Sequence, residues 1–294
     1  MRRTLALISS RPPQVVSDPQ LIDQGGICME TTRQAASRAP IDPLRTTALV
    51  AGILYLLTFA ASIPAVFLMG PVLTNPDYVL GAGADRQVIL GAFLDIITAL
   101  AGIGTAVALF SVVKRQHEGL AIGFVASRGF EAAALAVGAV SVLTVVTLRQ
   151  PGATGVEATS LVITQQALVA VKDWTFMIGP GMAGLNALLL GTLMYRSGLV
   201  PRIIPTLGLI GAPLFWSAQI ATMFGFNETA TVWSAVGLLP IFVWELTLGL
   251  WMTFKGFRKD APLMIEAAAE AAGVTGSPGG APSTVGAPAG AGAA

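Results

Sequence analysis

The sequence predicts an all-α integral membrane protein, built as a bundle of six transmembrane helices. Hydrophobic residues make up 54% of the 294 residues and charged residues only 11%, whereas a soluble domain carries about 25% charged residues. Six apolar segments each reach the ~20 residues with which a helix crosses the hydrocarbon core of a bilayer. The short alternating segments of a transmembrane barrel are missing, so the backbone hydrogen bonds must form within helices.

The six predicted spans lie between two polar ends of the chain. They comprise residues 46–69, 88–113, 120–148, 174–195, 203–223 and 231–254, within a transmembrane domain of residues 44–259. Residues 1–43 are expected to form a disordered cytoplasmic arm. Met29 is a second candidate start that would leave residues 1–28 outside the protein, and the residues do not decide between the two starts. Residues 260–294, rich in Ala, Gly and Pro, are expected to form a disordered cytoplasmic tail, with 267–272 as at most a brief extension of the last helix.

The placement of Lys and Arg predicts the orientation of the bundle, because basic residues gather on the cytoplasmic side. With the N-terminus inside, thirteen basic residues lie on the inner side, and only Arg86, Arg149 and Lys172 lie on the outer side. We therefore expect both termini to be cytoplasmic. The longest outer segment, residues 149–173, has two interpretations: a short helix lying on the outer surface, or an ordinary ordered loop.

Two charged residues lie inside the third predicted span. Arg128 and Glu131 are three residues apart, which places them on one face of a helix. A charge at this depth costs roughly 2.5 kcal/mol or more on insertion scales, so it is expected to be paired or functional. Counting helical rise puts Glu245 of the sixth span at a similar depth. One cation would then face two carboxylates, so either one carboxyl holds a proton or another donor contributes.

Arg128, Glu131 and Glu245 therefore form a candidate intramembrane polar cluster with two interpretations. In the first, the protein is non-enzymatic, and the buried Arg–Glu pair locks helix packing with no path for water. In the alternative, the protein is a proton-linked or small-solute transporter, and a polar cavity reaches Glu131 or Glu245 from one face. A cavity beside Glu131 is the observation that separates the two.

Further polar positions are secondary candidates. Asp95, in the second span, is either an outer-vestibule group or a structural residue that reaches the interface. Asn186 and Gln219 are expected to form hydrogen bonds between helices. Residues 179–184 match the G-x-G-x-x-G pattern, but they lie within a span with no preceding strand, which favours a kink at Pro180 over nucleotide binding.

The sequence offers no motif for catalysis, a cofactor or a metal. The H-E-x-x-H, G-x-S-x-G, Walker and C-x-x-C patterns are missing. One cysteine and one histidine exclude an intramolecular disulfide, a cysteine-only metal site and a multi-histidine metal site. The basic residues beside the spans fit lipid headgroups rather than nucleic acid. The expected partners are thus the lipid bilayer and, as an open alternative, a second copy or another membrane protein.

Four stretches of the chain carry a resemblance to a known family: residues 48–60, 123–132, 172–176 and 191–202. Their order and spacing resemble the bacterial membrane family catalogued as domain of unknown function 4386, over roughly residues 44–256. The resemblance implies a compact multi-helix membrane domain and, because the family is bacterial, a bacterial plasma (inner) membrane protein. It also implies that Arg128 with Glu131, and Asp173 with Trp174, belong to the pattern of the family. It supplies no biochemical mechanism.

Overall fold

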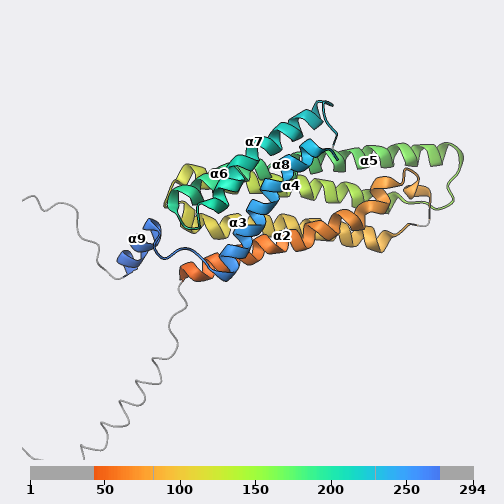
Figure 1. Cartoon of the computed structure of the whole chain (residues 1–294). Helices are drawn as coiled ribbons and strands as arrows, with labels where there is room; N and C mark the ends of the chain where they lie inside the picture. Colours follow the sequence, from red (N-terminus) through yellow and green to blue (C-terminus); the bar gives the residue numbers. More distant parts are fainter. Residues whose placement is uncertain (1–42, 82, 229, 272–294) are drawn as a thin grey trace, which may run out of the picture. The chain divides into compact units, whose positions relative to one another are not determined.

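The structure, a computed structural model, describes residues 43–81, 83–228 and 230–271. The expectations for the N-terminal arm, for Met29 and for residues 272–294 lie outside this part. The described chain is helical throughout, which confirms the predicted fold class. Its elements are α2 (Pro43–Thr74), the 3₁₀ turn η2 (Tyr78–Leu80), α3 (Asp85–Val113), α4 (Glu118–Leu148), α5 (Gly155–Gly181), α6 (Ala183–Ser197), α7 (Ile203–Met223), α8 (Val232–Phe254) and α9 (Pro262–Ala271) (Figure 1).

In the part of the chain that the structure describes, six helical segments are long and apolar enough to cross a membrane, with α5 and α6 forming one of them. Consecutive segments pack as antiparallel neighbours, and α8 packs against α2 (Figure 1). The end of the bundle that holds Arg45, Lys114, Arg196, Arg202 and Lys255 is called the basic end below. The N-terminus of α2 and the C-terminus of α8 both lie at this end, because the chain crosses the bundle an even number of times. The protein is therefore a multi-pass membrane protein.

The fourth span differs most from its prediction. It begins at Gly155 rather than at residue 174 and continues as one helix to Gly181. Residues 155–172 are thus neither a separate short helix nor a loop, but the first part of a continuous helix that ends at Gly181. Gln165, buried on this part, accepts a hydrogen bond from the Val79 backbone N–H at 2.8 Å and donates to the Asn75 carbonyl at 2.6 Å. These bonds hold α5 against the α2–α3 connection.

A polar group of the same connection secures the end of α4. Tyr78 donates its hydroxyl hydrogen to Asp85 at 2.8 Å, and Asp85 also pairs with Arg149. Arg149 in turn donates to the Gly81 carbonyl at 2.6 Å. Burial, together with the Asp85 carboxylate, raises the pKa of the Tyr78 hydroxyl above its usual range. At the end opposite the basic end, these contacts therefore tie the α2–α3 connection and the start of α3 to the end of α4.

The break between α5 and α6 lies where Pro180 lacks the N–H of a continuous helix. Two side chains of α7 bind carbonyl groups beside this break. Trp216 Nε1 donates to the Gly181 carbonyl at 3.0 Å, and Gln219 Nε2 donates to the Met177 carbonyl at 3.3 Å. The kink expected at Pro180 is present, and α7 satisfies backbone groups that lipid would leave unpaired.

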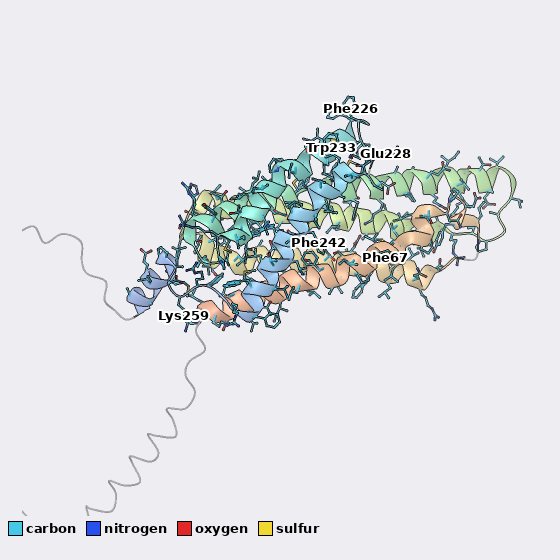
Figure 2. All side chains as sticks on the ribbon, in the orientation of Figure 1. Phe67, Phe226, Glu228, Trp233, Phe242 and Lys259 are labelled. Carbon is cyan, nitrogen blue, oxygen red and sulfur yellow. The ribbon has the colours of Figure 1, made fainter. Side chains whose placement is uncertain are left out.

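The predicted disordered tail does not begin at residue 260. Helix α9 covers Pro262–Ala271, and buried Ala261 and Leu263 join the main hydrophobic cluster. The Arg258 N–H also donates to the Leu199 carbonyl at 2.9 Å. The overall composition of residues 260–294 did not indicate this helix, because the few apolar residues of the tail all lie near its start. Figure 2 shows Lys259 at the start of this segment, near the basic end.

The main hydrophobic cluster fills the half of the bundle nearest the basic end. Its largest fully buried side chains include Phe124, Leu190, Trp244 and Leu248. Small residues allow the helices to approach closely here, as is usual in membranes. A Cβ on Gly249 of α8 would lie 3.1 Å from Tyr55 Cβ of α2, and one on Gly208 of α7 would lie 2.8 Å from the Trp244 ring of α8.

Candidate functional site

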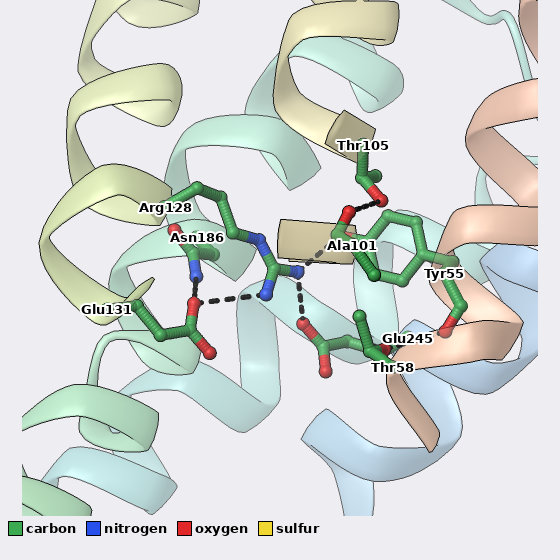
Figure 3. A network of polar contacts seen from close by, with 8 residues as sticks. All are labelled: Tyr55, Thr58, Ala101, Thr105, Arg128, Glu131, Asn186 and Glu245. Carbon is green, nitrogen blue, oxygen red and sulfur yellow. Dashed lines mark hydrogen bonds and ion pairs between the residues drawn. The ribbon is translucent and has the colours of Figure 1, made fainter. Parts of the chain in front are cut away.

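Arg128 is the centre of a polar network within the bundle. Its Nη1 donates to Glu131 Oε2 at 3.0 Å, and its Nη2 donates to Glu245 Oε1 at 2.8 Å and to the Tyr55 hydroxyl oxygen at 2.9 Å. The guanidinium also lies over the Tyr55 and Phe124 rings, at 5.1 Å and 5.8 Å from their centroids. Figure 3 shows the side chain reaching from α4 toward both Tyr55 and Glu245. One residue thus joins α4 to α2 and α8.

Close packing allows this long reach. Gly102 of α3 faces the stem of Arg128, and a Cβ at Gly102 would already lie 4.0 Å from Arg128 Cδ. The contact between Gly249 and Tyr55 holds α8 against α2, which sets Glu245 and Tyr55 on the same side of the guanidinium. The structure brings Arg128, Glu131 and Glu245 together, at the common depth that helical rise predicted.

Glu131 has a second donor from another helix. Asn186 Nδ2 of α6 donates to Glu131 Oε2 at 2.8 Å. Asn186 is therefore part of the cluster rather than a separate interhelical contact. It supplies an additional donor to a site with one cation and two carboxylates, whereas the Tyr55 hydroxyl oxygen accepts from Arg128.

Each glutamate keeps one oxygen outside the network. No described residue donates a hydrogen bond to Glu131 Oε1 or Glu245 Oε2. Figure 3 shows both oxygens pointing away from the guanidinium, on the same side. The two glutamate side chains are each 14% exposed, against 5% for Arg128. The accessible face of the cluster is therefore a pair of carboxylate oxygens.

A cavity of about 700 Å³ lies against this face. Arg128, Glu131 and Glu245 form its floor, and all the helices from α2 to α8 supply its walls. A volume of this size is typical of small-molecule sites. The cavity reaches both glutamates, and a cavity beside Glu131 is the arrangement that the transporter interpretation predicts.

The cavity occupies only one half of the bundle. On α2 the lining residues run from Thr58 to Val66, beyond Tyr55 as the helix leaves the basic end. On α8, which runs in the reverse direction, they run from Ser234 to Glu245, the residue at the floor. The main hydrophobic cluster fills the other half. The cavity therefore begins at the polar cluster and extends away from the basic end.

A second buried ion pair lies higher in the cavity wall. Lys172 of α5 donates to Asp95 of α3, and both side chains are 3% exposed. Lys172 Nζ also lies 5.6 Å from the centroid of the Phe176 ring. The expectation that Lys172 belongs to an outer loop is wrong, because the helix begins at Gly155. Asp95 pairs with this lysine and also lines the cavity.

Asp173 and Trp174 point in different directions although they are adjacent. Asp173 lines the cavity and forms no hydrogen bond or ion pair with another described residue. Trp174 is 49% exposed and is not part of the cavity lining. Of this pair, only Asp173 belongs to the site.

Sequence reasoning missed two residues of this region. Tyr55 is one of only three tyrosines in the chain and lies in an otherwise apolar span, which is a usable signal for a buried polar contact. Lys172 follows a segment in which apolar and polar residues alternate irregularly, so the local sequence does not indicate that its side chain is buried. Among the described residues, no group of three or more His, Cys, Asp or Glu side chains is arranged to hold a metal ion.

Fold and site together define a multi-pass membrane protein with a charged cluster at the floor of an intramembrane cavity. The chain belongs to the family described as domain of unknown function (DUF4386), whose model matches residues 50–256. This match confirms the resemblance carried by segments such as 123–132. No curated protein and no solved structure matches the chain.

Proposed function

We propose that the protein is a non-enzymatic carrier of a small solute, with its binding site in the cavity above Arg128. The observation that carries this proposal is the pair of unpartnered oxygens, Glu131 Oε1 and Glu245 Oε2, at the floor of a cavity of about 700 Å³. Charged groups inside a membrane are costly to retain and usually mark a pathway for a solute or ion. The lack of a catalytic motif supports a role without chemistry.

The side of the membrane from which the solute enters the cavity follows from the proposed orientation. We place the basic end in the cytoplasm of a bacterial cell, with both termini there, because basic residues favour that side. The cavity then opens toward the outer side of the inner membrane. The hydrophobic cluster between Arg128 and the basic end closes the cytoplasmic side, so the structure fits an outward-facing state of a carrier.

A panel of small solutes, screened by thermal unfolding of the purified protein, tests this function. A solute that binds only the folded state stabilises it, by about 2.7 kcal/mol at a hundred times its dissociation constant. Two neighbouring alanines provide matched variants. Ala132 is buried in the cavity wall, whereas Ala133 is exposed on the outside of α4.

Ala132→Phe fills part of the cavity, and Ala133→Phe adds the same ring on the outer face. We expect at least one solute to stabilise the wild type and Ala133→Phe but not Ala132→Phe. The same solute is expected to enter proteoliposomes that contain the wild type. A panel without such a solute, or one whose hits stabilise both variants equally, would overturn the proposal.

A structural role of the cluster is the second candidate function. It is favoured by the hydrogen bonds through which Arg128 and Glu131 connect α4 to α2, α6 and α8. In this case the cluster locks the rotation of the helices and binds nothing. The solute panel separates the two functions, because a pure lock predicts no solute that distinguishes the two phenylalanine variants.

A further inference from the structure

The charge of the cavity restricts the solutes that it accepts. At the floor, one guanidinium faces the carboxylates of Glu131 and Glu245. Higher in the wall, Lys172 is paired with Asp95, so Asp173 remains without an ion-pair partner in the described chain. Acidic groups thus outnumber basic groups around the same space, and an anion would meet a repulsive field.

Most N–H groups of the arginine are not available to a solute that enters from the cavity. Its Nη1 and Nη2 already donate to two carboxylates and a hydroxyl. Its Nε is enclosed without a partner. The unpartnered acceptors that a solute meets at the floor are Glu131 Oε1 and Glu245 Oε2, and a carboxylate oxygen accepts hydrogen bonds and donates none.

The walls favour a solute with an apolar body. Four phenylalanines line the cavity together with aliphatic side chains: Phe59, Phe176, Phe215 and Phe242. Phe59 and Phe242 pack edge to face with ring centroids 5.2 Å apart. Aromatic faces attract cations as well as apolar groups. A divalent metal ion would use none of these walls and requires about six oxygen ligands, which the two floor carboxylates do not provide.

We propose that the solute is a hydrophobic amine in its protonated form, an inference that rests on the proposed function. The ammonium N–H groups donate to Glu131 Oε1 and Glu245 Oε2, and the hydrocarbon body packs against the phenylalanines. Binding adds a positive charge to the floor, so the two carboxylates face two cations. Asp173 attracts the solute along the wall between the opening and the floor.

Three probes that share one hydrocarbon body and differ only in the head group test this class. Phenylbutylamine is a cation at neutral pH, phenylbutanol is neutral and phenylbutyrate is an anion. Binding to the full-length wild type in detergent is measured by calorimetry and by thermal unfolding. We expect the amine to bind at least about tenfold more tightly than the alcohol, as one charge-assisted hydrogen bond would give, and the anion to bind most weakly. Methylammonium, which lacks the hydrocarbon body, is expected to bind more weakly than phenylbutylamine.

Variants of the acidic residues locate the binding. Glu245→Gln and Glu131→Gln are each expected to weaken binding of the amine by about tenfold and to leave that of the alcohol unchanged. Glu228→Gln removes the same charge from an exposed position beside the α7–α8 turn (Figure 2) and is expected to have no effect. If both glutamine variants at the floor fail to fold, Asp173→Asn carries the test, because Asp173 forms no hydrogen bond that folding requires.

Equal affinity for the amine and the alcohol, or for the amine and methylammonium, would overturn the hydrophobic amine as the solute. The same conclusion follows if the floor variants and Asp173→Asn bind the amine like the wild type. Failure of the amine alongside a different hit in the solute panel would overturn the amine class and leave the carrier function standing. A panel with no hit at all would overturn both.

Discussion

Arg128 has no means of losing its charge within the bundle, since a guanidinium stays protonated in proteins. Its stability there depends on Glu131 and Glu245, which both accept hydrogen bonds from it. Either carboxylate alone neutralises the cation. Removing both leaves a buried cation with only the neutral Tyr55 hydroxyl as a described partner.

Variants of the two glutamates are therefore expected to differ strongly in stability. Glu131→Gln or Glu245→Gln alone should lower the free energy of unfolding by about 1–3 kcal/mol, the cost of one charged hydrogen bond. The double variant should lose about 3–5 kcal/mol, as when a buried charge loses its partner. Thermal unfolding of the purified proteins, with Glu228→Gln as the surface control, measures the difference. A double variant as stable as either single variant contradicts the paired state of Arg128.

At this scale, sequence reasoning found the core of the cluster. The spacing of Arg128 and Glu131 and the depth of Glu245 follow from helical geometry, which apolar spans obey closely. The contacts of Tyr55 and Lys172 were not predicted from helical geometry. A hydroxyl in an apolar span carries no mark of its partner, and Lys172 was assigned to a loop because its neighbours are polar. The pairing of Asp95 was not predicted for the same reason, since its partner Lys172 had been assigned to a loop.

The elements around the cavity are held by contacts between neighbouring helices, and the Asp95–Lys172 pair is one of them. It joins α3 to the half of α5 that was expected to be a loop. Both side chains are buried, so the loss of one leaves the other charge without compensation. Replacing both by neutral groups removes this penalty.

We expect Lys172→Met to lower the free energy of unfolding by about 3–5 kcal/mol, because Asp95 remains buried and unpaired. The double variant Asp95→Asn with Lys172→Met should be more stable than Lys172→Met alone. A double-mutant cycle measured by thermal or denaturant unfolding gives the coupling energy. Strictly additive effects of the two substitutions would show that the pair does not couple α3 to α5.

The approach of α5 to α4 beside Glu131 depends on Gly179. A Cβ at this position would lie 2.8 Å from Ala134 Cβ and 3.3 Å from the Glu131 carbonyl oxygen. Gly129 lies on α4 near the same level, and a Cβ there would meet no atom within 4 Å. The two glycines form a matched pair for the same substitution.

Gly179→Ala is expected to destabilise the protein by about 1–3 kcal/mol, as overpacking usually does. Gly129→Ala is expected to leave stability unchanged or raise it slightly, because alanine favours a helix over glycine. Unfolding temperatures of the two variants in one detergent provide the comparison. Equal shifts for both positions would mean that α5 does not approach α4 at Gly179 as described.

At the scale of the elements, the sequence predicted the number of spans and the bounds of α7, and it erred where polar residues lie inside helices. Length and hydropathy indicate a span only where the apolar run is continuous. The first half of α5 contains Gln165 and Lys172, whose polar groups are satisfied by other helices. These hydrogen bonds depend on how the helices pack against one another, so the local sequence pattern does not predict them.

For the whole molecule, the proposed carrier function predicts that water reaches the bundle from one side only. Ser62 lines the cavity on α2, whereas Thr105 of α3 lies buried beyond the floor, toward the basic end. Lys255 is exposed at the basic end itself. A cysteine reacts with a maleimide through its thiolate, which forms only where water reaches the sulfur. A cysteine at position 62 therefore tests access from the cavity side, one at position 255 tests access from the basic end, and one at position 105 tests access to the interior.

With Cys28 replaced by serine, cysteine is introduced at one of these positions at a time. In intact cells, a membrane-impermeant maleimide should label Ser62→Cys and leave Thr105→Cys and Lys255→Cys unlabelled. In inverted vesicles, it should label Lys255→Cys, because basic residues favour the cytoplasmic side. Labelling of Ser62→Cys only in inverted vesicles would reverse the proposed orientation. Labelling of Thr105→Cys as fast as Ser62→Cys would show that the floor formed by Arg128, Glu131 and Glu245 is open, and the outward-facing state would then be wrong.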